Sequence, residues 1–137
     1  MQKLKKITIN NEQDILITVT AVRSMLARCS FSAVDEQKIL VSISELTRNI
    51  IDHANGKGWF LCEVISHGIK IVVKDCGPGI GNLEEILVGK KRTQPKGLGL
   101  GLRGVKTLMD EFHIEKNEKG GTTILAIKWE SCTSTSR

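Results

Sequence analysis

The sequence predicts an α+β protein folded as a two-layer α/β sandwich. After one short strand pattern, helical patterns fill the chain to residue 54, and strand patterns prevail beyond it. This segregation of helices from strands is typical of the α+β class. The length of 137 residues suits one domain with a substantial core. We therefore expect a single domain over residues 1–130 and a disordered polar tail over residues 131–137.

The N-terminal part is expected to contain one strand and two helices. Residues 4–9 are expected to form a short strand, because Ile7 and Ile9 alternate with polar neighbours. Asn11 suits a helix N-cap, and apolar residues then recur at helical spacing as far as Leu26. A second helix is expected over residues 33–54, on an apolar stripe made of Ile39, Ile43, Leu46 and Ile50.

The middle of the chain is expected to hold a β-hairpin. Residues 59–66 and 69–74 have strand character, and a tight turn at His67-Gly68 is expected to join them. The Gly- and Pro-rich stretch that follows does not suit a regular element, but residues 83–88 fit a short helix.

The C-terminal part is expected to contain a loop, a helix and two more strands. Residues 89–98 are basic and irregular, which is typical of a mobile surface loop. Two strands are expected over residues 113–117 and 122–129, joined by a turn at Lys119-Gly120-Gly121. Between the loop and these strands, one helical face is formed by Val105, Leu108, Met109 and Phe112.

Composition excludes several classes of protein. The net charge of +5 suggests an anionic ligand, but the chain has no Tyr, three Phe and two Trp, too few for a base-stacking surface. We expect no nucleic acid and no membrane as partners, since no apolar run reaches the roughly 18 residues of a membrane span. The N-terminus lacks the apolar segment of a signal peptide, so a cytoplasmic location is expected. The four cysteines lie far apart, which favours inert thiols over zinc or disulfide chemistry.

A glycine run between residues 97 and 104 is the first candidate binding element. Residues 99–104 spell G-x-G-x-x-G, but no strand directly precedes them, as a dinucleotide-binding fold requires. The motifs of eukaryotic-type protein kinases and of P-loop proteins are missing as well. Glycines that open a helix can still aim free backbone N–H groups at a phosphate. A flexible linker is the alternative, but a linker would not lead straight into a well-patterned helix.

Two further patterns suggest chemistry. Glu45 and Asn49 are four residues apart, so they lie on one helix face beside the apolar stripe. A carboxylate and an amide oxygen at this spacing can serve a hydrated divalent cation and a proton transfer. Asp75 ends an apolar strand and begins D-x-G-x-G, where it can accept hydrogen bonds from an amino group. A solvated helix face and a turn-forming Asp are the alternative interpretations.

Taken in order, these motifs resemble those of a known superfamily. E-L-T-R-N (45–49), D-C-G-P-G (75–79) and G-L-G-L-G (97–101) are similar to the N, G1 and G2 boxes of the GHKL (Bergerat-fold) ATPases. Gly121-Thr122 is similar to the last motif of that superfamily. The chain is too short for the partner domains of gyrase, Hsp90 or a histidine kinase. It most resembles the small anti-sigma-factor type of serine/threonine kinase, and in particular the stressosome switch kinases of the RsbT type.

The resemblance implies a Bergerat fold, with a mixed, mostly antiparallel sheet covered on one face by helices. It also implies ATP and Mg²⁺ as cofactors, with Glu45 as the general base and Asn49 as the magnesium ligand. Asp75 would bind the adenine amino group with support from Thr122, and residues 89–98 would form the lid. The remaining expected contacts to adenine or phosphate are Gly77, Gly79, Lys96, Gly97, Gly99, Gly101 and Arg103.

The resemblance further implies a protein substrate. A kinase of this type phosphorylates a serine or threonine of a STAS-domain protein, and the added charge breaks the interface between them. The kinase then binds and activates a phosphatase, within the regulation of a stress-response sigma factor. Two alternatives stay open: an anti-sigma factor that mainly sequesters a sigma factor, and a catalytically silent nucleotide sensor.

Overall fold

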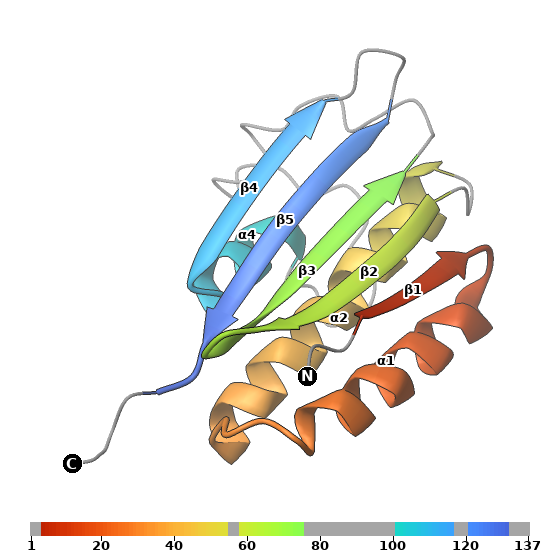
Figure 1. Cartoon of the computed structure of the whole chain (residues 1–137). Coiled ribbons are helices and arrows are strands. Elements are labelled where there is room, and N and C mark those ends of the chain that lie inside the picture. Colours follow the sequence, from red (N-terminus) through yellow and green to blue (C-terminus); the bar gives the residue numbers. More distant parts are fainter. Residues whose placement is uncertain (1–3, 55–57, 76–100, 117–120, 132–137) are drawn as a thin grey trace.

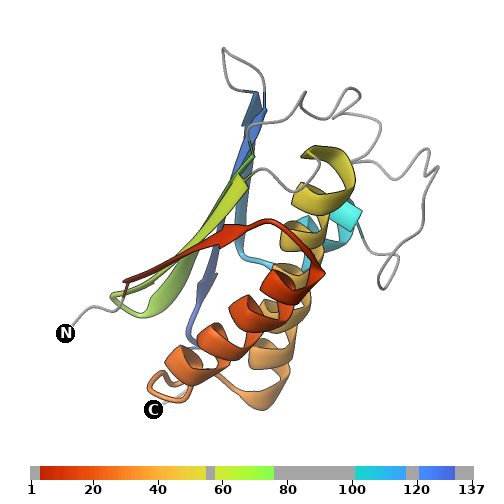
Figure 2. The same cartoon turned by 90° about the vertical axis from the view of Figure 1, so that its right-hand side faces the viewer.

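The protein folds as a two-layer α+β sandwich, as the sequence predicts. The computed structural model describes residues 4–54, 58–75, 101–116 and 121–131. The described helices are α1 (Glu12–Leu26), α2 (Ala33–Ala54) and α4 (Gly101–Leu108). All three lie on the same side of the sheet (Figures 1 and 2). No helix within the described ranges is long and apolar enough to cross a lipid bilayer.

One five-stranded sheet forms the second layer. Its strands are β1 (Leu4–Ile9), β2 (Gly58–Ile65), β3 (Gly68–Asp75), β4 (Glu111–Lys116) and β5 (Thr122–Trp129). Their order across the sheet is β1-β2-β3-β5-β4, and all four neighbouring pairs are antiparallel. The predicted sheet was mostly antiparallel, and the described one is entirely so.

The core lies between α2 and the inward side of the sheet. The predicted apolar stripe of α2 is almost completely buried, with Ile39, Ile43 and Leu46 at 0% exposure. Phe60 and Ile71 point inward from the central strands and are also at 0%. Burial alternates along β2, β3 and β5, as expected for a sheet with one face against the core. The alternation therefore assigns each strand residue to an inward or an outward face.

The N-terminal elements begin and end close to where the sequence predicts. Asn11 caps α1 in a capping box, in which its side chain accepts from the Asp14 backbone N–H and the Asp14 carboxylate accepts from backbone N–H groups before the helix. β1 and α2 have the predicted bounds. Local capping and periodicity therefore suffice to place these elements.

Several predicted boundaries differ from the structure, among them the start of β4, which was expected at residue 113 and lies at Glu111. The turn of the β2–β3 hairpin consists of Ser66 and His67, and His67 has a positive φ of 64°. Gly68 instead belongs to β3, where it pairs with Ile65 and Trp129. The Trp129 ring lies so close to it that a Cβ at residue 68 would be 2.7 Å from Trp129 Cε3. Phe112 was assigned to a helical face, but α4 ends at Leu108 and Phe112 lies in β4.

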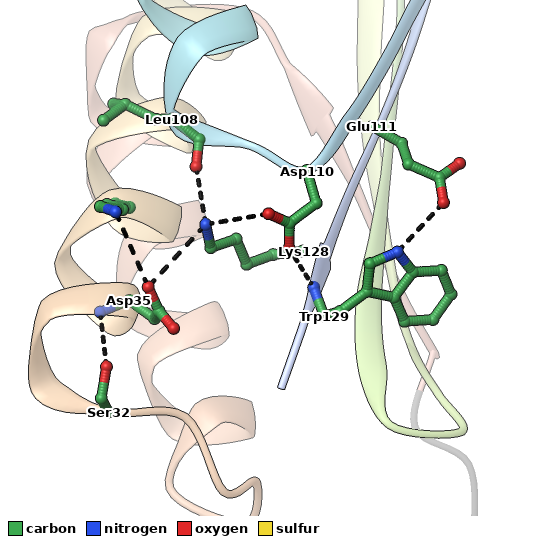
Figure 3. A network of polar contacts seen from close by, with 8 residues as sticks. Ser32, Asp35, Leu108, Asp110, Glu111, Lys128 and Trp129 are labelled. Atoms are coloured by element: carbon green, nitrogen blue, oxygen red, sulfur yellow. Dashed lines mark hydrogen bonds and ion pairs between the residues drawn. The ribbon is translucent and has the colours of Figure 1, made fainter. Parts of the chain in front are cut away.

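A buried lysine, which the sequence analysis missed, joins three elements on the inward side (Figure 3). Lys128 of β5 is 6% exposed. Its Nζ donates to the Leu108 carbonyl at the end of α4 at 2.9 Å, and lies 3.4 Å from Asp110 Oδ1 and 3.8 Å from Asp35 Oδ1 of α2. The positive charge thus meets a helix C-terminus and two carboxylates. The sequence pattern does indicate this burial, because residue 128 continues the inward alternation of Ile124 and Ala126.

Candidate active site

Glu45 lies at the contact between α2 and α4. Its side chain projects from the C-terminal half of α2, and the residue is only 4% exposed. The backbone N–H of Gly101, the first residue of α4, donates to Glu45 Oε1 at 3.4 Å. A free N–H at a helix N-terminus carries partial positive charge, which suits a carboxylate. The structure therefore joins the E-L-T-R-N segment to the end of the glycine run.

Asn49 lies one turn beyond Glu45 on α2 and has an unpaired polar atom. Its Nδ2 is buried, and it has no hydrogen-bond partner among the described residues. A buried amide without a partner costs roughly 1–3 kcal/mol. Such an atom in a folded protein suggests a position that another group satisfies. Glu45 and Asn49 thus share a helix side, as the sequence predicts.

A second group of polar residues lies where β3 ends beside the start of β5. Asp75 is 7% exposed, and its Oδ1 accepts the Thr122 backbone N–H at 3.2 Å. Gly121 has a φ of +92°, and a Cβ there would lie 2.1 Å from the Asp75 carbonyl oxygen. Only glycine allows this close approach of the two backbones. The structure therefore brings Asp75 and Thr122 together, whereas their expected roles toward adenine stay a prediction.

Thr122 contributes a second unpaired polar atom. The residue is only 1% exposed, and its buried Oγ1 has no hydrogen-bond partner in the described part of the chain. The hydroxyl belongs to the residue whose backbone holds the Asp75 carboxylate. It can both donate and accept, so a ligand or a water molecule can satisfy it.

The other predicted site residues are placed as follows. Arg103 lies in the first turn of α4 and is exposed to solvent. No three His, Cys, Asp or Glu residues cluster into a metal cage within the described ranges. The predicted helix 83–88 and lid 89–98 lie outside the described residues, as do most of the tail and the site residues Gly77, Gly79, Lys96, Gly97 and Gly99.

The described cysteines fit the expectation of inert thiols. Cys62 of β2 is buried, and burial, with smaller effects from Cys29 and Glu63, raises its pKa from 9.0 to about 12. Burial followed by the charges of Glu130 and Glu36 also raises the pKa of Cys29. Both are free thiols. Since the thiolate is the reactive form, neither suits nucleophilic chemistry at neutral pH.

Known proteins resemble the chain over nearly its whole length. Residues 12–128 match the model of the histidine kinase-like ATPase domain. The chain is 39% identical over 127 residues to the serine/threonine-protein kinase RsbT of Bacillus subtilis (strain 168), covering 90% of this chain and 94% of that protein. It is 26% identical over 133 residues to the anti-sigma F factor of Clostridium novyi (strain NT), covering 92% and 93% respectively.

A solved structure shares the fold. The crystal structure of the RsbU and RsbW domains of a Mycobacterium tuberculosis protein superimposes with a TM-score of 0.69 at 18% sequence identity. The alignment covers 98% of this chain and 34% of that chain, so this chain spans about a third of its length.

Proposed function

The chain belongs to the histidine kinase-like ATPase (GHKL) family, among its serine/threonine-protein kinases, and we propose that it phosphorylates a STAS-domain protein and then switches to a phosphatase partner. This exchange would act in the regulation of a bacterial stress-response sigma factor. The observation that carries the proposal is the buried Glu45 carboxylate, held against the first N–H of α4. That position joins a proton acceptor to the end of the phosphate-binding glycine run.

Glu45 is the proposed general base. Phosphoryl transfer depends mainly on positioning and charge neutralisation, and the protein needs one group to accept the proton of the attacking hydroxyl. Glu45 is the buried carboxylate nearest to Asn49 along α2. A glutamate there can take the proton of a serine or threonine hydroxyl presented at the mouth of the site. Gly101 positions the carboxylate through its backbone N–H.

Asn49 is the proposed protein ligand of Mg²⁺. The ion accepts amide oxygens and usually takes few protein ligands, because phosphates and water complete its octahedral shell. The amide oxygen of Asn49 would bind the ion, while the unpaired Nδ2 is a hydrogen-bond donor that would face an acceptor such as a phosphate oxygen. When bound with ATP, the ion would neutralise phosphate charge.

Asp75 and Thr122 are the proposed adenine site. Adenine presents an amino group that donates hydrogen bonds, and a buried carboxylate is a strong acceptor. Asp75 is held by the Thr122 N–H, while the Thr122 hydroxyl is left to extend the network toward the base or a bound water. Gly77 and Gly79 would shape the rest of the pocket. The phosphates would lie under a lid of residues 89–98 and would be contacted by Lys96, Gly97, Gly99, Gly101 and Arg103.

A second function is supported by the anti-sigma F factor relative. Its name describes a protein that acts on a sigma factor, so this chain could also act mainly by sequestering one. The higher identity to a protein named as a serine/threonine kinase favours phosphotransfer as the main activity. Binding to a sigma factor is a surface property, whereas phosphotransfer requires Glu45, so a variant at Glu45 separates the two functions.

The test is intact-mass spectrometry of a cognate STAS-domain protein after incubation with this chain, ATP and Mg²⁺. We expect one added phosphate with the wild-type chain and none with Glu45→Gln. A matched control is Glu36→Gln, which changes another glutamate of the same helix far from the site and should leave the phosphate transfer intact. If the STAS protein stays unmodified while ATP binding is intact, the proposed substrate is wrong, and a sigma-factor pull-down decides for the sequestering function.

A further inference from the structure

The short helix α4 is tied to α2 at both of its ends. At its N-terminus, the Gly101 N–H donates to Glu45 of α2 at 3.4 Å. At its C-terminus, the Leu108 carbonyl accepts from the Lys128 Nζ at 2.9 Å. The same nitrogen lies 3.8 Å from Oδ1 of Asp35, near the start of α2. Helix α4 therefore runs beside α2 in the opposite direction, with a polar contact at each end.

The spacing of these two contacts on α2 matches the length of α4. The eight residues of α4 rise about 12 Å along the helix axis. Residues 35 and 45 are about 15 Å apart along the axis of α2. Figure 3 shows the Lys128 side chain extending between β5 and α2, with the Leu108 carbonyl and the Asp35 carboxylate around its end. The lysine thus supplies the link that the backbone of α4 does not reach by itself.

The apolar packing of α4 does not fix its position along α2. A helix of eight residues is unstable on its own in water, so its place depends on tertiary contacts. Leu102 and Val105 are buried, at 2% and 0% exposure, and hold one side of α4 against the core. Apolar contacts are non-directional, so they determine which side is buried more than the height along α2. The directional contacts at the two ends are left to fix that height.

The contact between Gly101 and Glu45 tolerates little movement of α4. Its N···O distance of 3.4 Å is longer than the usual value of about 2.9 Å, and at about 3.6 Å the hydrogen bond is lost. A shift of a few tenths of an ångström is therefore enough to break it. The carboxylate would then lose the donor that fixes its direction.

Lys128 is placed to prevent such a shift. The residue is 6% exposed, and its Nζ lies 3.4 Å from Asp110 Oδ1. Asp110 is itself held on β5, because its N–H donates to the Ile127 carbonyl and its Oδ2 accepts from the Trp129 N–H at 2.7 Å. The end of α4 is thus anchored to the sheet, and Lys128 extends this anchor to Asp35 on α2. A buried cation adds direction more than net stability, because lost hydration offsets much of its attraction to the carboxylates.

From these contacts we propose that Lys128 is a positioning residue for phosphotransfer, although it lies at the opposite end of α4 from Glu45. Lys128 fixes the C-terminal end of α4, and the helix carries this constraint to Gly101. The Gly101 N–H then sets the direction of the Glu45 carboxylate. This inference rests on the proposed function, because it takes Glu45 as the general base. Lys128 acts through α4 and not by contact with the substrate.

A spectroscopic test examines the contact itself and needs no substrate. The amide signal of Gly101 is followed by ¹H–¹⁵N NMR in the full chain. Glu45→Ala supplies the position of this signal when the carboxylate is absent. We expect Lys128→Met to move the signal toward that reference, and Lys128→Arg, which keeps a cation with several donors, to move it back. An unmoved signal in folded Lys128→Met would overturn the proposal.

A kinetic test measures the consequence for phosphotransfer to the STAS-domain protein. In single turnover at saturating ATP, Lys128→Met should lower the rate by about 10- to 100-fold, because a small misplacement of a catalytic group has effects of this size. Lys128→Arg should recover most of the rate. The affinity for ATP should change less than the rate, because Thr122, with Asp75 beside it, lies at the opposite end of β5 from Lys128.

Two control variants separate positioning from a general loss of stability. Lys38→Met removes another lysine that faces Asp35, at 3.9 Å, but this ion pair stays within α2. Val22→Ala opens a cavity beneath α1, which packs on α2, β1 and β2. Both folded variants should keep the Gly101 signal and the rate close to wild type, and urea unfolding measures how far each is destabilised. A rate loss in Val22→Ala equal to that in Lys128→Met, at equal destabilisation, would count against positioning.

The two tests also distinguish this inference from the proposed function. If the wild-type chain transfers no phosphate to the STAS-domain protein, the proposed substrate or activity is wrong, and the Gly101 signal still decides whether Lys128 holds the contact. If the wild-type chain transfers phosphate and Lys128→Met does so equally fast, the proposed function stands and Lys128 has no positioning role.

Discussion

The backbone N–H of Gly101 donates to Glu45 Oε1 across 56 residues of sequence, at 3.4 Å. The bond joins the first residue of α4 to the first residue of the E-L-T-R-N segment on α2. It is longer than a typical N–H···O bond of 2.9–3.0 Å, so it orients the carboxylate more than it neutralises it. The bond therefore fixes the direction of the carboxylate that we propose as the general base.

Replacing Glu45 by Gln should abolish phosphotransfer while ATP binding persists. The amide keeps an oxygen that accepts from the Gly101 N–H, so the local structure is retained, but it cannot take a proton. We expect a loss of about 10²- to 10⁴-fold in single-turnover rate and an unchanged Kd for ATP in isothermal titration. Unchanged turnover in this variant would remove Glu45 as the base.

Replacing Asp75 by Asn should abolish measurable ATP binding, a loss of at least about 100-fold. The Asn oxygen can still accept the Thr122 N–H, and this would point the new NH₂ group at the adenine amino group, donor against donor. GTP is the informative comparison, because its base presents a carbonyl at the same position, which the wild-type carboxylate disfavours and the new NH₂ group can bind. A general structural defect would weaken ATP binding with no gain for GTP, whereas the proposed contact predicts a loss of ATP and a gain of GTP binding.

Replacing Thr122 by Val should move stability and ATP affinity in opposite directions. The Thr122 hydroxyl is buried without a partner in the described structure, so an isosteric methyl should leave the free energy of unfolding unchanged or raise it slightly. ATP affinity should fall about tenfold, because the hydroxyl is then missing from the adenine network. Urea unfolding and titration calorimetry measure the two effects. Equal ATP affinity in both proteins would remove the hydroxyl from the site.

Replacing Lys128 by Met should lower the free energy of unfolding by about 2 kcal/mol. The change leaves the Leu108 carbonyl and two carboxylates without their shared cation. Lys38→Met is the matched control, since Lys38 also faces Asp35, at 3.9 Å, but is more exposed. It should cost less than about 0.5 kcal/mol. Equal losses in the two variants would show that the Lys128 network adds no specific stability.

The buried thiol of Cys62 should make stability fall at high pH. Its pKa is about 12 in the folded protein and 9.0 in the unfolded chain. The unfolded chain therefore releases its proton first, and the stabilisation present below pH 9 is lost as the pH rises toward 12. The slope is about 1.4 kcal/mol per pH unit. Urea unfolding of wild type and Cys62→Ala at pH 8 and pH 10, under reducing conditions, should show their difference shrink by this amount.

Local patterns in the sequence were sufficient to predict those elements whose position depends on local periodicity. The α2 stripe and its polar opposite face predict the helix because 3.6-residue periodicity determines which side can be buried. The same reasoning went wrong at Phe112, where periodicity continued past the end of α4. There the Asp110 N–H donates to the Ile127 carbonyl, and its carboxylate accepts from the Trp129 N–H. These contacts to a strand that comes later in the chain end the helix, and no local pattern encodes them.

In the candidate site, too, some residues could be chosen from the sequence, whereas the contacts between them could not be predicted. Motif resemblance singled out Glu45, Asn49, Asp75 and Thr122 as candidates, because the chemistry of nucleotide binding limits the residue types that can serve, and their roles stay predictions. Two contacts depend on how distant segments of the chain meet: the hydrogen bond between Gly101 and Glu45, and the close packing of Gly121 against the Asp75 backbone. Lys128 was not singled out in the sequence, although the alternation along β5 places it inward.

The position of β1 at the sheet edge has a consequence for synthesis of the chain. Ile9 pairs with Gly58, so β1 cannot find its partner until the whole α1–α2 segment has left the ribosome. Until then the apolar stripe of α2 has no sheet to cover it, since β2, β3 and β5 are all made later. Exposed apolar surface on a nascent chain is a target for chaperones and a source of aggregation. Slow translation just after α2 should therefore lower the soluble yield, and chaperone overproduction should recover it.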